Sequence, residues 1–336
     1  MKEAEKFFFE VKNFIKKHHL ISKDDKILCA LSGGMDSVCL LHILANLKKP
    51  LGFNLACIHI NHNLRTKDSN KDEAFAKEMS KSLNIPCYSK SVDVKAFATN
   101  NKISNEEAAR ILRYKAFEQI KTEFLFDKIA CAHHANDQAE TLIMRFCKGS
   151  LLGGLRGMDP LSKNRVIRPL LQSTKEQISA YLKENNLNFR QDNSNENIDI
   201  MRNNIRHKII PQLKEAINNN IIKTLSEKAI YFSYAKQYFE DNIEKLAHDL
   251  QERVDDKTYY LKKNIRDESK FIRISIVHQI LQTLLKSHEN ISLKHLEACD
   301  EEILKNNTGS SLNLPKGIVF ATLDNYYSFS ISNIAL

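Results

Sequence analysis

The sequence predicts an α/β fold: a doubly wound parallel sheet, then a helical region, then a small α+β C-terminal unit. Two observations carry this prediction. Short apolar runs alternate with segments of helical spacing along the first half of the chain, which is the pattern of parallel strands joined by helices. Most of the nine glycines gather at 33–34 and 149–157, where backbone must bend sharply or approach a ligand closely.

The N-terminal elements can be assigned one after another. Helices are expected where apolar residues recur at helical spacing, and strands where apolar runs are short. The pattern Ser104-Asn105-Glu106-Glu107 has the form of a capping box that opens a helix. In chain order the sequence predicts a helix over 5–19, a strand over 26–31, a helix over 37–47, a strand over 53–60, a helix over 69–83, a strand over 87–92, the helix after Ser104, a strand over 128–132 and a helix from about Asn136.

Beyond this region the pattern becomes mainly helical. Thr174 begins a Thr-x-x-Gln capping pattern, 191–197 is polar like a loop, and 202–214 is a basic helix. Residues 216–250 have helical spacing throughout. Near the end, Pro315-Lys316-Gly317 followed by alternating apolar residues predicts a hairpin. We therefore expect three parts: 1–215 with the sheet, a helical linker over 216–256, and a small α+β domain over 257–336.

Composition narrows the class of protein. No apolar run approaches the roughly 20 residues of a membrane span, and the N-terminal segment lacks the apolar core of a signal peptide. We therefore expect a cytoplasmic protein without a membrane partner. Seven scattered cysteines, none in a Cys-x-x-Cys pair, argue against a zinc knuckle or a disulfide framework. A net charge of +9 favours a polyanionic partner such as nucleic acid, although a Lys-rich surface alone would also produce it.

The strongest motif is Ser32-Gly33-Gly34-Met35-Asp36-Ser37, between a predicted strand and a predicted helix. Its glycines allow backbone N–H groups to turn inward as a phosphate cradle at a helix N-terminus. Asp36 would repel phosphate unless a cation lay between them, so it is a candidate ligand of Mg²⁺. The Gly-Lys-Ser/Thr of a Walker A loop and the Gly-x-Gly-x-x-Gly of a dinucleotide fold are both absent. The simpler interpretation is an ordinary strand-to-helix turn.

Four further segments carry candidate chemistry, each with a plainer interpretation. Asn61, His62 and Arg65 follow a strand and are candidates for reaching nucleotide, or form a polar loop. Arg110 and Arg113 share a helix face suited to phosphate, although Glu106 and Arg110 also have ion-pair spacing.

The other two segments are His133 to Thr141 and Arg202 to Lys208. Asp137 and Glu140 are spaced to meet on the first turn of a helix, where they would bind a cationic amine, accept its proton, or simply complement the helix dipole. A metal hydrolase built on the two adjacent histidines and Asp137 is a rival. Arg202 and Arg206 form a basic stripe suited to RNA phosphates, or a solvated helix face.

Taken in order, these segments resemble the tRNA(Ile)-lysidine synthetase family, a branch of the N-type ATP pyrophosphatases or PP-loop superfamily. The resemblance is dense over about 20–215. It is carried by Ser32 to Ser37, Asn61 to Arg65, Glu107-Ala108-Ala109-Arg110, Arg113-Tyr114, His133 to Thr141, Gly153-Gly154-Leu155-Arg156-Gly157-Met158, Arg168-Pro169-Leu170, Asp192, Arg202-Asn203 and Arg206.

The resemblance implies an adenine nucleotide alpha-hydrolase-like fold and a reaction. ATP adenylates the 2-carbonyl oxygen of the wobble cytidine in an isoleucine tRNA with a CAU anticodon, and free L-lysine displaces AMP to leave lysidine. The family comparison implies 1–215 as the ATP-binding catalytic domain and 257–336 as a tRNA contact. The sequence does not decide whether the protein is a homodimer, because it shows no recognisable interface.

It also implies roles for individual residues. Ser32, Gly33, Gly34, Met35, Asp36, Ser37 and His62 would bind ATP, with Asp36 and Mg²⁺ positioning the polyphosphate. Arg113 and Arg206 would stabilise charge on the transferring phosphate. Asp137 and Glu140 would bind the lysine ammonium, with Asp137 as the base, and Arg202, Asn203 and Arg206 would bind tRNA.

Two rival functions differ in class. A tRNA-thiolating enzyme of the same superfamily would need catalytic cysteines or Cys-x-x-Cys metal pairs, and this chain has no such pairs. A non-catalytic RNA-binding protein would explain the basic charge but would leave the phosphate loop and the paired carboxylates without a task.

Overall fold

The computed structural model describes residues 2–63, 66–148, 155–190, 201–285 and 291–331. The chain divides into two compact units, Met1–Tyr234 and Ala235–Leu336. The boundary falls inside one long helix, so the division into three parts stays a prediction. The loop expected over 191–197 lies outside the described residues.

The N-terminal unit is built on a five-stranded parallel sheet of order β3-β2-β1-β4-β5. The prediction of a doubly wound parallel sheet is confirmed. Because the central strand β1 lies between β2 and β4, the chain leaves it in opposite directions, and the carboxyl ends of β1 and β4 border the switch point where ligands bind in such sheets. The strands are β1 (Lys26–Ala30), β2 (Asn54–Asn61), β3 (Cys87–Ser91), β4 (Lys128–Ala130) and β5 (Val166–Ile167).

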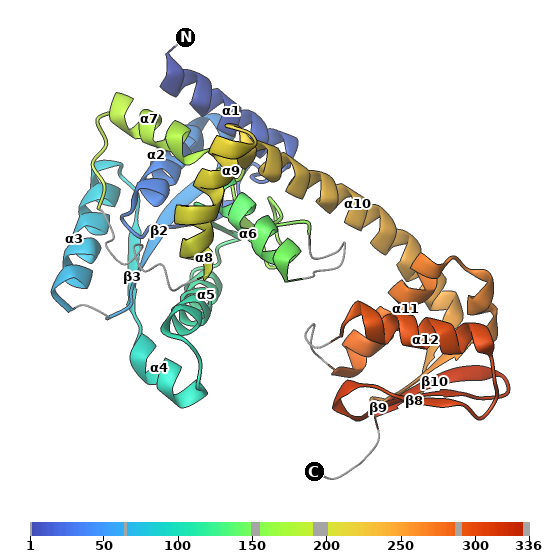
Figure 1. Ribbon diagram of the computed structural model, residues 1–336. Helices are drawn as coiled ribbons and strands as arrows, with labels where there is room; N and C mark the ends of the chain where they lie inside the picture. Colours follow the sequence, from blue (N-terminus) through green and yellow to red (C-terminus); the bar gives the residue numbers. More distant parts are fainter. Residues whose placement is uncertain (1, 64–65, 149–154, 191–200, 286–290, 332–336) are drawn as a thin grey trace. The chain divides into compact units, whose positions relative to one another are not determined.

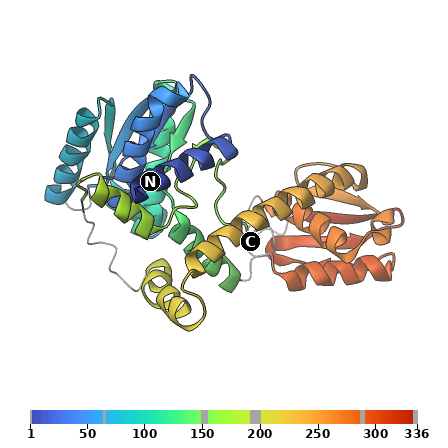
Figure 2. The same ribbon diagram turned by 90° about the horizontal axis from the view of Figure 1, so that it is seen from above.

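Helices cover both faces of this sheet. One face packs against α1, α2, α3 and α7, and the other against α5; α3 lies beside the strands in both views (Figures 1 and 2). Alternate strand residues enter the two cores, as pleating requires. The helices are α1 (Glu3–Lys17), α2 (Met35–Leu51), α3 (Thr66–Ser82), α4 (Val94–Asn101), α5 (Asn105–Glu123), α6 (Ala135–Cys147) and α7 (Lys175–Glu184).

The predicted helix starts are confirmed by their caps. The Ser104 hydroxyl accepts the Glu107 N–H at 3.2 Å at the start of α5. Thr174 and Gln177 form a full capping box before α7, each side chain accepting the other's N–H. Such caps satisfy backbone donors that a helix leaves open. The short helix α4 was not predicted from the sequence.

The basic helix predicted over 202–214 is interrupted. It runs as α8 (Met201–Asn204), a π-helical segment η3 (Ile205–Ile209) and α9 (Ile210–Ala216). The expectation of unbroken helix over 216–250 is wrong at its start, because the Asn218 side chain accepts the Asn220 N–H at 2.8 Å and makes a turn. The long helix α10 (Ile221–Leu250) follows this turn.

The C-terminal unit is the predicted small α+β fold. Its antiparallel sheet has the order β6-β7-β10-β9-β8, and α11 and α12 pack on one another and on this sheet. The predicted hairpin is confirmed: β8 and β9 pair antiparallel around η5 (Pro315–Gly317). The other elements are β6 (Gln251–Arg253), β7 (Thr258–Lys262), η4 (Lys263–Asp267), α11 (Lys270–Leu285), α12 (Leu293–Lys305), β8 (Ser311–Asn313), β9 (Ile318–Thr322) and β10 (Tyr326–Ile331).

A buried ion pair joins α11 and α12 in this unit. Arg273 of α11 donates through Nε to Asp300 Oδ1 of α12 at 2.6 Å, and its Nη1 donates to the Glu268 carbonyl at 2.6 Å.

Among the helices that the structure describes, none is long and apolar enough to span a bilayer.

Candidate active site

The loop from Ser32 to Ser37 joins β1 to α2. Ser37 Oγ donates to the Gly34 carbonyl at 2.8 Å and accepts the Ser32 N–H at 3.2 Å, while Ser32 Oγ accepts the Gly34 N–H at 3.3 Å. Gly33 has φ +90°, which favours glycine. These bonds curl the loop around the N-terminus of a 17-residue helix, whose partial positive charge attracts anions. The geometry suits a phosphate cradle.

The loop is braced from outside by residues that the sequence did not single out. The Arg190 N–H donates to the Gly33 carbonyl at 2.9 Å, and the Arg190 side chain pairs with Asp72 of α3 at 2.9 Å. A Cβ on Gly33 would lie 3.3 Å from the Phe75 ring. The phosphate loop therefore fits closely between α3 and the segment before residue 191.

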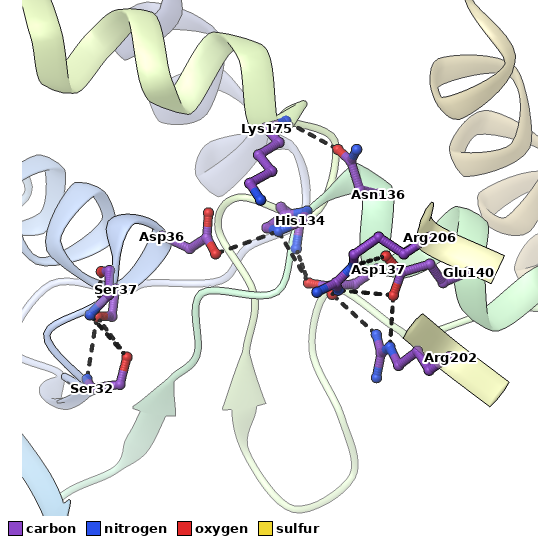
Figure 3. Close-up of polar contacts among 11 residues, drawn as sticks. Ser32, Asp36, Ser37, His134, Asn136, Asp137, Glu140, Lys175, Arg202 and Arg206 are labelled. Atoms are coloured by element: carbon purple, nitrogen blue, oxygen red, sulfur yellow. Dashed lines mark hydrogen bonds and ion pairs between the residues drawn. The ribbon is translucent and has the colours of Figure 1, made fainter. Parts of the chain in front are cut away.

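Asp36 and Asp137 meet through a histidine. His134 Nε2 lies 3.5 Å from Asp36 Oδ2 and 3.6 Å from Asp137 Oδ2 (Figure 3). Burial disfavours the charged ring, but Asp137 and Asp36 outweigh burial and raise the pKa of His134. The other oxygen of Asp36, Oδ1, is buried and makes no hydrogen bond within the described residues. The ends of β1 and β4 are thus linked by a carboxylate–histidine–carboxylate chain.

Asp137 and Glu140 are themselves paired with arginines. Arg202 donates to Glu140 Oε2 at 2.7 Å and to Asp137 Oδ1 at 3.0 Å, and Arg206 donates to Glu140 Oε1 at 2.6 Å (Figure 3). Residues from α6 and from the α8–η3 segment therefore share one carboxylate–guanidinium cluster. The interpretation of Arg202 and Arg206 as a solvated face is wrong, because both side chains turn inward to these carboxylates.

The surroundings favour the charged forms of Asp137 and Arg206. The Glu140 side chain is 0% exposed, and a buried carboxylate at such a place needs hydrogen-bonded partners. Burial would raise the pKa of Asp137, but His134 and Arg202 lower it overall. Burial opposes the charge of Arg206, and the bond to Glu140 raises its pKa.

The remaining predicted residues lie on β2, α5 and α8 or directly after β2. His62 is half-buried after β2, and Asn203 of α8 is buried. Asn61 braces its own loop by accepting the Asn63 N–H at 3.0 Å. Arg113 is exposed on α5 and makes none of the contacts of the His134 chain. Leu64, Arg65, Gly153, Gly154 and Asp192 lie outside the described residues.

Comparison with known proteins decides the family. A PP-loop domain model matches residues 3–213. The tRNA(Ile)-lysidine synthase of Clostridium perfringens is 39% identical over 311 residues, which cover 92% of this chain and 66% of the relative. That of Clostridioides difficile is 34% identical over 317 residues, covering 93% and 68%. The chain belongs to the tRNA(Ile)-lysidine synthase family. It spans about two thirds of the length of these relatives.

A solved structure adds evidence on the fold of this tRNA(Ile)-lysidine synthase family member. The U34-tRNA thiolase NcsA from Methanococcus maripaludis, with its [4Fe-4S] cluster, aligns with a TM-score of 0.55 at 17% identity. The alignment covers 67% of this chain and 79% of the thiolase. At this identity the likeness shows the fold alone, and it confirms the adenine nucleotide alpha-hydrolase-like architecture.

Mg²⁺ can be tested against the residues of this family member. Among the described residues, no group of three or more His, Cys, Asp or Glu is arranged to hold a metal. Mg²⁺ in nucleotide sites usually takes only one or two carboxylates together with substrate phosphates. The unpartnered Asp36 Oδ1 beside the phosphate loop fits that requirement.

Sequence reasoning also missed Lys175 and the linking role of His134. The Lys175 N–H donates to Asn136 Oδ1 at 3.0 Å, and the Ala135 N–H donates to the Ser173 carbonyl at 2.8 Å, so the starts of α6 and α7 are tied together. The Lys175 side chain points toward Asp36 and His134 (Figure 3). The capping pattern at Thr174 predicted the start of α7. It could not predict that this start lies beside the start of α6.

Proposed function

We propose that this chain ligates lysine to the 2-position of the wobble cytidine of an isoleucine tRNA with a CAU anticodon, with ATP and Mg²⁺, releasing AMP and pyrophosphate. The family to which the chain belongs supports the reaction. The observation that carries the proposal is the His134 link, 3.5 Å from Asp36 and 3.6 Å from Asp137. This link joins the loop from Ser32 to Ser37 to the carboxylate pair of Asp137 and Glu140, which supports the proposal.

In the first step the cytidine O2 forms a bond to the α-phosphorus of ATP, and the bond to the β-phosphate breaks. The loop from Ser32 to Ser37 binds the phosphates through backbone N–H groups, together with His62 nearby. Asp36 would hold Mg²⁺, and the ion when bound would supply positive charge to the phosphates. Arg113 supplies further positive charge, and Lys175 is a cation oriented toward the same space.

In the second step the ε-nitrogen of lysine attacks C2 of the adenylated base, the C2–O bond breaks, and AMP leaves with its oxygen. The amine must lose a proton during this step. AMP is a far better leaving group than a ring carbonyl oxygen, which explains why ATP is spent. Asp137 and Glu140 bind the incoming ammonium because they are carboxylates already built to hold a cation.

The arginines give this site an exchange mechanism. Arg202 and Arg206 occupy the carboxylates in this structure, so a lysine ammonium entering there takes over bonds that a guanidinium held. A guanidinium released in this way becomes available to RNA or to the transferring phosphate, the roles expected of Arg202, Asn203 and Arg206. Because the pKa of Asp137 is lowered, it binds ammonium well and accepts a proton only after the guanidinium groups have moved away from it.

The substrates suggest where the enzyme works. Free lysine, ATP and tRNA meet in the cytoplasm, so we place the protein there. The C-terminal unit is proposed as a further tRNA contact. Light scattering of the purified chain decides between a monomer and the homodimer that the sequence left open.

One assay tests the proposal. The chain is incubated with Mg-ATP, radiolabelled lysine and unmodified isoleucine tRNA, and both lysine in RNA and released AMP are measured. We expect equimolar lysine incorporation and AMP, and none with a tRNA lacking the CAU anticodon. RNA binding without AMP would instead indicate a non-catalytic RNA-binding protein. AMP release that requires a sulfur donor would indicate a thiolating enzyme.

A further inference from the structure

A second group of arginines lies at the β4–β5 end of the same unit. We call Arg110, Arg145, Arg156 and Arg168 the arginine cluster. Three of them converge on one turn: Arg145 Nη1 donates to the Gly157 carbonyl at 2.7 Å, Arg168 Nη1 donates to the Asp159 carbonyl at 2.6 Å, and Arg156 pairs with the Asp159 carboxylate at 3.0 Å. They come from α6, from the segment after β5 and from the turn itself.

Arg110 joins the cluster from α5. Its guanidinium lies 5.8 Å from the ring centre of Tyr114, and Tyr114 packs on the core that contains β4 and β5 residues. Burial lowers the pKa of Arg145, and so do the charges of Arg156 and Arg110, while the charge of Asp159 opposes them. The cluster members are therefore close enough to repel one another.

Three members of the cluster, Arg110, Arg156 and Arg168, have a single carboxylate among them in the described residues. In the described part of the chain, Asp159 is the one carboxylate ion-paired with Arg110, Arg156 or Arg168. The Glu106–Arg110 pair that the spacing allowed is not formed within those residues, and Arg168 is bonded to a carbonyl rather than a carboxylate. The site beside the phosphate loop, by contrast, has two carboxylates for its two arginines. Gathering several guanidinium groups around one carboxylate is costly, and an anionic ligand relieves that cost.

Two buried atoms point to a bound group. Arg168 Nε and His133 Nδ1 are buried and have no hydrogen-bond partner among the described residues. Burial lowers the pKa of His133 to about 4, assisted by Arg168, Arg202 and Arg110 and opposed by Asp137. The ring is therefore neutral at physiological pH. An oxygen-rich anion would accept from Arg168 and, with the appropriate tautomer, from His133.

The position of the cluster indicates which anion it receives. Arg168 follows β5 and the phosphate loop follows β1, and β4 lies between these strands. Neighbouring strands are about 4.8 Å apart, so the two places are separated by roughly 10 Å. A phosphate bonded directly to the loop is therefore beyond hydrogen-bond distance of a group at the end of β5. The phosphates of the RNA substrate are a second source of the same chemistry.

We propose that the arginine cluster binds phosphodiester groups of the RNA strand that carries the target base. This inference rests on the proposed function for the identity of the RNA. Guanidinium groups suit it because they contact phosphate through two parallel N–H donors. The cluster would hold the strand while the base turns toward the His134 chain.

The test compares the variant Arg110→Gln/Arg168→Gln with Lys115→Gln. Lys115 is a matched control because it lies on the same helix, is exposed, and stands 5.1 Å from an aromatic ring, that of Phe97. Isoleucine tRNA binding is measured at several salt concentrations. We expect the double variant to bind on the order of tenfold more weakly, with a salt slope lower by about 0.7–0.9 for each phosphate that is no longer neutralised. The control should keep the wild-type slope.

Further measurements complete the test. If Arg168→Gln unfolds the chain, exposed Arg110→Gln alone must still lower the slope. A variant that weakens ATP binding without tRNA, while the tRNA slope is unchanged, would assign the cluster to nucleotide phosphate and overturn the proposal. So would a wild-type protein that binds no tRNA. The wild-type protein could also bind tRNA with a salt slope that the variant lowers, yet incorporate no lysine. That outcome would support RNA binding by the arginine cluster and reject the proposed reaction.

Discussion

In the described residues, two carboxylate–guanidinium clusters with buried carboxylates differ in character. In the C-terminal unit Arg273 and Asp300 pair one to one, with side chains only 9% and 6% exposed. In the N-terminal unit Arg202 and Arg206 are 27% and 28% exposed, while the carboxylate they share, Glu140, is fully buried.

The difference distinguishes a structural ion pair, in the C-terminal unit, from a cluster that can bind a ligand, in the N-terminal unit. Arg273 has both its carboxylate and a carbonyl as acceptors, and its contacts join two helices. The N-terminal cluster keeps its carboxylates inside and its cations partly in solvent, next to an Asp36 oxygen that has no partner among the described residues. Cations that reach solvent can be exchanged, whereas those sealed in a core cannot.

The largest expected effect comes from Asp137→Asn. The substitution keeps the shape of the side chain but removes the charge that would bind lysine, so lysine incorporation should fall by about 10³-fold or more. ATP binding should change little. Single-turnover incorporation and equilibrium ATP binding measure the two effects. Asp300→Asn is the control, and it should alter stability but not the incorporation rate of folded enzyme. Unchanged turnover in Asp137→Asn would reject its assignment.

The second prediction concerns stability. Arg273→Met leaves Asp300 buried without its cation, which should cost about 3–5 kcal/mol of the unfolding free energy. Arg202→Met should cost only about 1–2 kcal/mol, because Arg206 still holds Glu140 and the Arg202 side chain is partly in solvent. Urea unfolding of both variants checks the ranking. Equal decreases in stability would mean that the two clusters do not differ as described.

The third and smallest effect is a pH dependence. Because the pKa of His134 is raised above its usual 6.5, folding favours the protonated ring. That contribution is fully present below about pH 6.5 and is lost as pH rises through the folded pKa. Between pH 6 and pH 8, wild-type protein should therefore lose more unfolding free energy than His134→Gln. Asp137 adds no slope there, since its lowered pKa affects only acid conditions. Identical pH profiles would contradict the raised pKa.

Local patterns predicted the strands, the capped helices and the phosphate loop, because each depends on neighbouring residues. The Ser104 and Thr174 caps and the turn at Gly33 are of this kind. The sequence spacing also identified Asp137 and Glu140 as a pair. It could not reveal that arginines 62 to 69 positions away would neutralise them.

Other features depended on competition between contacts. The spacing of Glu106 and Arg110 permits an ion pair, yet Arg110 lies over Tyr114 instead. His134 became a link only because the ends of β1 and β4 are neighbours in the sheet. Such outcomes are decided by tertiary packing, which periodicity does not encode.

The π-helical segment from Ile205 to Ile209 has a consequence for how this site changes over time. A π turn accommodates one residue more than an α turn, and each residue rotates a helix by about 100°. Arg202 lies before this extra residue and α9 lies after it. In an α-helix the loss of one residue would turn Arg202 relative to α9, but the wider π turn takes up its extra residue within one turn. Loss of one residue from this segment would therefore leave Arg202 and α9 in nearly their present orientation. An insertion or deletion at this turn is thus tolerated by the helices on either side of it.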